Sequence, residues 1–172
     1  MEGIPVIATE RLYFRKFSEG DAPLLWKLNE DPAVTRYTGD PIFSLEQALG
    51  VLKEIILPQY DLYGMGRWAV HLKVTGEFMG WCGLKNRPER NEIDLGYRFM
   101  KVFWGQGYAY ESAMASIEYG FKVLNLNTII GRAMPENIAS WKVLKKCGMR
   151  FVREEFVDGH PALTYIIQKA TL

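Results

Sequence analysis

Two glycines at alternate positions, Gly105 and Gly107, stand directly before a run of residues with helical spacing. Glycine adopts backbone conformations that let successive N–H groups converge on one point, and the first N–H groups of a helix have no partners within it. The helix dipole adds a partial positive charge at the same place. The spacing therefore predicts an anion-binding turn over residues 105–109, and phosphate is the anion that we expect.

Two common nucleotide-binding motifs do not match this turn. A P-loop requires Lys followed by Ser or Thr after its last glycine, whereas Tyr108 and Ala109 follow Gly107 here. A dinucleotide-binding fingerprint requires a small residue where Tyr110 stands and an acidic residue about 20 positions further on, at the end of the next strand. The predicted strand at 128–130 has no such acidic residue. Neither motif therefore explains the glycines.

The turn instead resembles the acyl-CoA-binding motif of the GNAT superfamily of N-acetyltransferases, Gln/Arg-x-x-Gly-x-Gly/Ala. Gly107 and Ala109 match the glycine and the final small residue, while Trp104 stands at the Gln/Arg position. The tryptophan is similar to the Tyr/Phe-Trp-Gly-x-Gly-Tyr-Ala form of the ribosomal-protein N-terminal acetyltransferases (RimJ/RimL-type). We therefore interpret this departure as a marker of that branch.

Two further segments carry the same resemblance. Residues 137–149 resemble the family helix that begins Asn-x-x-Ser/Ala and ends Gly-Phe, and its asparagine, Asn137 here, contacts the pantetheine arm in the family. Residues 9–12 read Thr-Glu-Arg-Leu, which is similar to the opening of the branch just named. Three segments in the family order cover nearly the whole chain and make the resemblance specific.

The resemblance implies that acetyl-CoA is the co-substrate. Its pyrophosphate would be held by the N–H groups of residues 105–109, and the preceding strand would offer N–H groups to pantetheine and to the thioester oxygen. One cation among Lys142, Lys145, Lys146 and Arg150 would meet the 3′-phosphate. The expected coenzyme-binding residues are Phe99, Met100, Val102, Gly105, Gln106, Gly107, Tyr108, Ala109, Asn137 and Lys145.

Three residues are candidates for proton transfer. Glu92 and Asp94 stand two apart on a predicted strand, so their side chains share a face, and either could relay a proton from an amine through water. The alternative for both is a solvated face. Many superfamily members have a tyrosine eight residues after the helix asparagine, and this tyrosine acts as the acid that protonates the departing thiolate. This chain has Lys145 at that position. Ser140, which matches a serine of the ribosomal-protein branch, is therefore the expected donor to the coenzyme sulfur; the alternative is a surface serine.

The expected reaction is transfer of an acetyl group from acetyl-CoA to a primary amine. The resemblance to the ribosomal-protein branch makes the α-amine of a protein or peptide the best interpretation. An α-amine has a pKa of about 7.7–8.0, so it needs only modest help from a general base, unlike lysine. A small-molecule amine or an amino-sugar is the alternative acceptor. A non-catalytic acyl-CoA sensor is an alternative from another class, favoured by the missing helix tyrosine.

Composition excludes other classes of protein. The chain has 172 residues, a net charge of +1 and 24% charged residues, so we expect a single domain over 1–172 and no nucleic-acid partner. Two cysteines indicate no disulfide framework, and no apolar run is long enough for a membrane, so a cytoplasmic location is expected. His71 and His160 show no metal-ligand spacing. We expect a monomer or homodimer.

The elements that must position these residues alternate in an α/β (α+β) pattern. Predicted strands cover 12–17, 68–73, 78–84, 91–100, 128–133, 151–157 and 163–168. Predicted helices begin near Ser18, Asp31, Ser44, Ala109 and Asn137, and Pro58 is expected to end the third. By resemblance this is the GNAT fold, a mixed, mostly antiparallel sheet that is splayed between its fourth and fifth strands and flanked by helices. Gly96 in the fourth strand predicts either a bulge or close packing of a neighbour.

Overall fold

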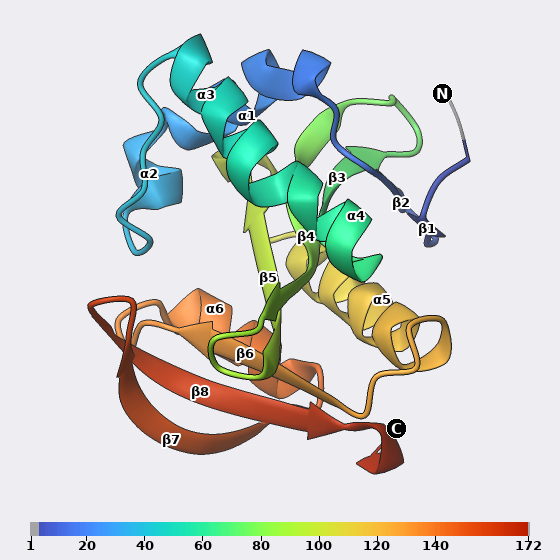
Figure 1. Ribbon diagram of the computed structural model, residues 1–172, viewed down its shortest axis with the longest axis vertical. Helices are drawn as coiled ribbons and strands as arrows, with labels where there is room; N and C mark the ends of the chain where they lie inside the picture. The colour runs from blue at the N-terminus through green and yellow to red at the C-terminus, as the bar shows by residue number, and fades with distance from the viewer. Residues whose placement is uncertain (1–3, 172) are drawn as a thin grey trace.

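The computed structural model describes residues 4–171, and an eight-stranded sheet runs through it in the order β1-β2-β3-β4-β5-β6-β8-β7 (Figure 1). The strands are β1 (Ile7–Ala8), β2 (Leu12–Arg15), β3 (Arg67–Leu72), β4 (Phe78–Arg87), β5 (Glu92–Phe99), β6 (Thr128–Ala133), β7 (Arg150–Val157) and β8 (His160–Gln168). The helices are η1 (Glu19–Asp21), α1 (Ala22–Asn29), α2 (Pro32–Thr35), α3 (Leu45–Val51), η2 (Leu52–Ile56), α4 (Leu57–Tyr63), η3 (Lys101–Phe103), α5 (Tyr108–Lys122), α6 (Ile138–Lys146) and η4 (Lys169–Thr171).

The sheet opens at one place, between β5 and β6. These two strands are parallel and pair only at Asp94 and Leu95, whereas every other neighbouring pair in the sheet is antiparallel. Figure 1 shows β5 and β6 running in clearly different directions. The part of β5 from Gly96 to Phe99 therefore has a free edge on the β6 side. The predicted mixed sheet, splayed between these two strands, is confirmed.

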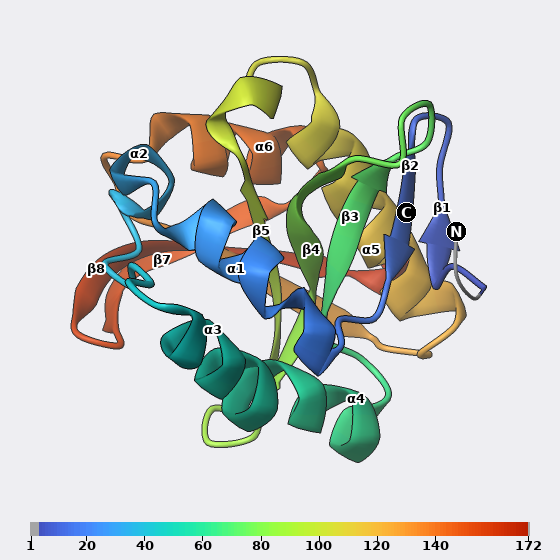
Figure 2. The same cartoon turned by 90° about the horizontal axis from the view of Figure 1, so that it is seen from above.

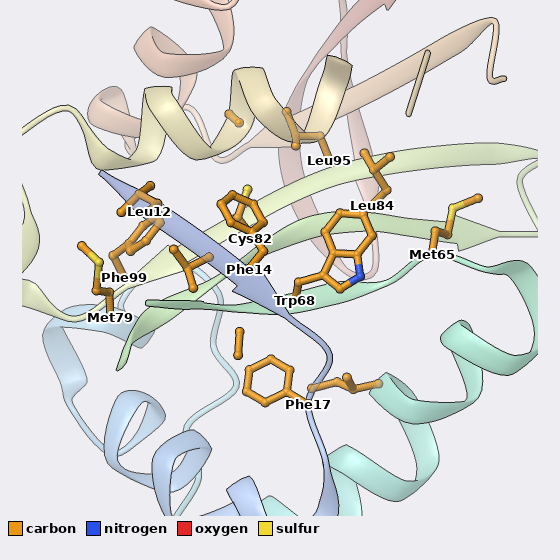
Figure 3. Packing of buried hydrophobic residues seen from close by; sticks show 14 of the residues in the cluster. Leu12, Phe14, Phe17, Met65, Trp68, Met79, Cys82, Leu84, Leu95 and Phe99 are labelled. Atoms are coloured by element: carbon orange, nitrogen blue, oxygen red, sulfur yellow. The ribbon is translucent and has the colours of Figure 1, made fainter. Parts of the chain in front are cut away.

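Helices cover both faces of the sheet. Figure 2 shows α5 and α6 behind it and α1, α3 and α4 in front. The apolar face of α5, which includes Ala113, Ile117 and Phe121, is fully buried. In Figure 3, Cys82 and Leu95 lie on the α5 side, whereas Phe17 lies among the helices of the opposite side. Apolar residues thus alternate along the strands to supply two cores.

The third predicted helix does not end at Pro58. Helices α3, η2 and α4 follow one another without a break as far as Tyr63, and Gly64 ends the run in a left-handed conformation. Residues 52–56 form a π-helix, whose wider turn changes the hydrogen bonding just before the proline. Pro58, which has no N–H to donate, follows as the second residue of α4, so the change in hydrogen bonding stands directly before it.

The bulge predicted at Gly96 is wrong, and the alternative of close packing holds. Strands β4 and β5 pair in continuous register from Gly80 opposite Phe99 to Arg87 opposite Glu92. A Cβ at Gly96 would lie 2.7 Å from the guanidinium carbon of Arg67. The glycine therefore makes room for a buried arginine that crosses the sheet face.

Candidate functional site

A cleft of about 840 Å³ lies between the helices in front of the sheet and the open edge of β5. Its floor is formed by β4 and β5, and it continues to Asn137 and Ser140 at the start of α6. Residues of the β7–β8 turn, including Asp158 and His160, border it on another side. The lining near the opening includes Arg67, Trp81, Lys85, Arg87, Asp94, Gly96, Tyr97, Arg98 and Arg132. The sheet opening thus connects this cleft with α6 on the far face.

The turn before α5 has the backbone conformation that its glycines predict. Gly105 and Gly107 have φ angles of 75° and 84°, in the left-handed region, and Gly107 is the N-cap of α5. No atom lies within 4 Å of the position that a Cβ would take at Gly105, so this side of the turn is open. Converging N–H groups at an open helix end fit a pyrophosphate group.

The amino-terminal segment holds this turn in place. Arg11 Nη1 donates to the Gln106 carbonyl oxygen at 3.0 Å, and Arg11 Nε donates to Glu111 Oε1 at 2.7 Å. The Thr9 hydroxyl donates to Glu111 Oε2 at 2.6 Å. Burial alone would raise the pKa of Glu111, but these bonds hold it below its ordinary value. Residues 9–12, which resemble the opening of the family branch, therefore hold the first turn of α5.

The free edge of β5 carries N–H groups that face the opening. The Met100 N–H donates to the Met79 carbonyl oxygen at 2.9 Å, on the β4 side, so it is not the free donor that the resemblance implied. Because backbone groups alternate along a strand, the N–H groups of Tyr97 and Phe99 point to the other edge. The Phe99 carbonyl accepts from Trp104 Nε1 at 2.8 Å, which ties the turn to the strand.

The predicted residues of α6 lie together with a tyrosine that sequence reasoning missed. Asn137 is the N-cap of α6, and its side-chain oxygen accepts from the Ser140 N–H at 3.4 Å. The Tyr97 hydroxyl donates to the Ser140 carbonyl oxygen at 2.7 Å and lies 3.2 Å from Ser140 Oγ. Burial raises the pKa of Tyr97, so this hydroxyl keeps its proton. Asn137 and Ser140 are both half-buried.

Asp94 lies in the cleft, where its carboxylate forms an ion pair with an arginine. Asp94 Oδ2 is 3.3 Å from Arg67 Nη2, and both side chains are 15% exposed. Arg67 Nη1 also donates to the carbonyl oxygens of Asp94 and Gly83, each at 2.8 Å. Burial lowers the pKa of Arg67, and Asp94 opposes that effect. The ion pair therefore positions the Asp94 carboxylate beside the opening.

Glu92, the second predicted proton acceptor, is occupied by ion pairs. Its carboxylate lies 2.9 Å from Arg132 Nη1 and 3.1 Å from Arg90 Nε. Burial would raise the pKa of Glu92, but the bonds to Arg132 and Arg90 outweigh it and lower the pKa. The structure thus separates the two carboxylates, since only Asp94 lines the cleft.

The basic residues of α6 differ in their positions. Lys145 Nζ lies 5.8 Å from the centre of the Trp141 ring on its own helix. Lys146 Nζ lies 4.3 Å from the ring of Tyr110, in the first turn of α5. Lys146 is therefore the α6 cation placed beside the proposed phosphate turn.

The remaining predicted coenzyme residue, Val102, is 72% exposed in η3, and its carbonyl oxygen accepts from Gln106 Nε2 at 3.1 Å. Within residues 4–171, no cluster of three or more His, Cys, Asp or Glu side chains could hold a metal ion. None of the helices in this part of the chain combines the length and hydrophobicity that crossing a membrane requires.

Comparison with known proteins agrees with this geometry. Residues 11–150 match the family described as acetyltransferase (GNAT) domain. The uncharacterized N-acetyltransferase p20 of Bacillus licheniformis is 35% identical over 139 residues, which is 79% of this chain and 77% of that protein. A solved acetyltransferase from Agrobacterium tumefaciens superposes with a TM-score of 0.83 at 28% identity, covering 98% of this chain and 96% of that chain. The ribosomal L7/L12 alpha-N-protein acetyltransferase RimL, in complex with coenzyme A, superposes with a TM-score of 0.81 at 18% identity, covering 96% and 98%.

Proposed function

Because this chain belongs to the GNAT acetyltransferase family and is an acetyl-CoA-dependent N-acetyltransferase, we propose that its acceptor is an α-amine, in the first instance that of a protein or peptide. The observation that carries this proposal is the ion pair between Asp94 and Arg67. Arg67 places a positive charge beside the Asp94 carboxylate, and that charge disfavours a permanently charged ammonium group at the same place. This arrangement suits an amine that is partly neutral near pH 7.7–8.0 better than a lysine side chain of pKa about 10.4.

Acetyl-CoA supplies an activated acetyl thioester when it is bound. The residues proposed to hold its pyrophosphate are those of the turn from Gly105 to Ala109, where N–H groups converge at an open helix end. The cations proposed for its 3′-phosphate are Lys145 and, better placed beside the turn, Lys146. Asn137 remains the proposed contact for the pantetheine arm.

The groups around the opening between β5 and β6 are the ones proposed to take part in the reaction. The Tyr97 and Phe99 N–H groups point to the free edge of β5 and are the proposed donors to a developing oxyanion. Asp94 is the proposed proton acceptor on the cleft side, through water, and is preferred to Glu92. Ser140 Oγ is the proposed proton donor on the α6 side, with Tyr97 orienting it.

An acceptor panel tests the proposal. Release of free thiol from acetyl-CoA, corrected for hydrolysis, should be faster with peptides that have a free α-amine, such as those that begin with Ala, Ser or Met, than with peptides whose only amine is a lysine side chain. The same peptides with a blocked amino terminus and an internal lysine are the matched controls, and an amino-sugar and a polyamine represent small-molecule amines. Faster turnover of the blocked peptides would contradict the α-amine proposal. Acetyl-CoA binding without thiol release for any amine would favour a non-catalytic sensor.

A further inference from the structure

The floor of the cleft carries a row of cations. Strands β4 and β5 pair with Trp81 opposite Arg98, Lys85 opposite Asp94, and Arg87 opposite Glu92, and Arg67 crosses the same face. The guanidinium carbons of Arg67 and Arg98 lie 5.1 Å and 5.3 Å from the Trp81 ring centre. Cationic side chains therefore outnumber the carboxylates of this floor.

Four of the cleft cations have carboxylate partners. Arg67 pairs with Asp94, Arg87 with Asp158 at 2.8 Å, Arg98 with Asp40 at 3.1 Å, and Arg132 with Glu92 at 2.9 Å. The Lys85 side chain, in contrast, makes no ion pair or hydrogen bond with any residue from 4 to 171. It is thus a cation that lines the cleft without an anion to balance it.

The surroundings of Lys85 increase the need for such an anion. The side chain is half-buried, and burial lowers its pKa; Arg67 and Arg87 lower it further, while Asp94 and Asp158 act in the opposite direction. Those two carboxylates form ion pairs with the neighbouring arginines, and neither forms an ion pair with Lys85. An unpaired, partly buried charge costs free energy that a bound anion would recover.

We propose that Lys85 binds a carboxylate of the acceptor, placed only a few bonds from the amine that is acetylated. This inference rests on the proposed function, since it takes Asp94 as the neighbour of the amine. Lys85 stands directly opposite Asp94, and such cross-strand neighbours have Cβ atoms about 5 Å apart. An acceptor that reaches both side chains must therefore hold its amine and its anion close together.

The charge count favours a carboxylate over a phosphate group. The adjacent guanidinium groups are already neutralised, so one lysine offers a single positive charge and no bidentate fork. A polyamine is disfavoured, because its ammonium groups would meet the Lys85 charge that no carboxylate balances. The carboxylate has two possible sources: the α-carboxylate of a free amino acid, or the side chain of an amino-terminal aspartate or glutamate in a peptide.

The experiment compares acceptors that differ only in the carboxylate. One pair is leucine and leucinamide, and the other is a short peptide amide beginning with aspartate and its asparagine counterpart. The wild type should favour the carboxylate member of at least one pair by about tenfold in kcat/KM, or about 1.4 kcal/mol. The pair that shows this preference identifies the source. Lys85→Met should reduce the preference to near unity, and Lys85→Arg should keep most of it.

Lys73→Met is the matched control, because Lys73 is exposed in the β3–β4 turn and away from the cleft lining. It should keep the wild-type preference. Calorimetry with acetyl-CoA checks that each variant is folded. A wild type that treats both members of both pairs alike, or a Lys85→Met variant that keeps the preference, would overturn the inference while leaving amine acetylation intact. No thiol release with any of the four acceptors would instead overturn the proposed function and this inference with it.

Discussion

Two glycines with the same backbone angle offer a controlled test of where acetyl-CoA binds. Gly105, in the proposed phosphate turn, and Gly76, in the β3–β4 turn, both have φ of 75°, and no atom lies within 4 Å of a Cβ at either position. Substitution with alanine therefore adds no clash at either site. Each should cost about 1–2 kcal/mol, the usual penalty of an L-residue in the left-handed region.

The two substitutions should differ in their effect on the coenzyme. At Gly105 the penalty is relieved when the backbone rotates, and rotation turns N–H groups away from their common point. We expect Gly105→Ala to weaken acetyl-CoA binding by about tenfold or more, or about 1.4 kcal/mol, and Gly76→Ala to leave it within about twofold. Both variants should lose a similar few degrees of Tm, roughly 2–4 °C for each kcal/mol in a chain of this size.

Calorimetry with acetyl-CoA and thermal unfolding of the protein alone separate binding from stability. A folded Gly105→Ala variant with wild-type affinity would refute the placement of the pyrophosphate at this turn. An equal loss of affinity in Gly76→Ala would show that the effect comes from general destabilisation.

Three other perturbations test separate parts of the site. Ser140→Ala should lower kcat by about tenfold to a hundredfold while acetyl-CoA affinity stays within a few fold, because its hydroxyl acts on charge that develops during turnover; a wild-type rate would make Ser140 a surface residue. With its preferred amine, the wild-type kcat/KM should rise to a plateau at about pH 8, and a steep rise continuing above about pH 9 would point to a lysine-like acceptor. Burial opposes the ionisation of Glu155, but Thr164 and the nearby arginines lower its pKa to about 2, below its ordinary value of 4.5. The wild type should therefore lose this stabilisation between pH 4.5 and about 2, and Glu155→Gln should show a shallower acid transition in denaturant unfolding measured at each pH.

Local patterns predicted the succession of helices and strands and the left-handed glycines before α5, because these depend on residues close together in the sequence. The open sheet was predicted from the family resemblance, since it depends on how distant strands pair. Asn137 and Ser140 stand on one helical turn, and Gly105 and Gly107 in one loop. The π-helix before Pro58 was not predicted, since its hydrogen bonding depends on how the helix packs over the sheet.

The partners of the catalytic candidates could not be predicted, because they come from distant segments. Asp94 and Arg67 are far apart in the sequence and meet because β3 and β5 flank β4. Tyr97 reaches Ser140 only across the opening of the sheet. From their spacing, Glu92 and Asp94 were equally good candidates for the proton acceptor, because both lie on one strand face. In the structure, arginines of β6 and of the β4–β5 turn form ion pairs with Glu92 and so distinguish it from Asp94.

Arg67 connects the chemistry of the cleft with its selectivity. Gly83 and Gly96 stand opposite each other on β4 and β5, and the lack of a side chain at Gly96 lets the guanidinium group lie against the sheet. There it forms an ion pair with Asp94 and adds positive potential beside Lys85. One cation therefore disfavours a permanently charged amine beside Asp94, which favours an amine that is already partly neutral, and it strengthens the attraction of an acceptor carboxylate. Both effects depend on tertiary neighbours and lie outside the coenzyme motifs, so homologues that share those motifs can accept different amines.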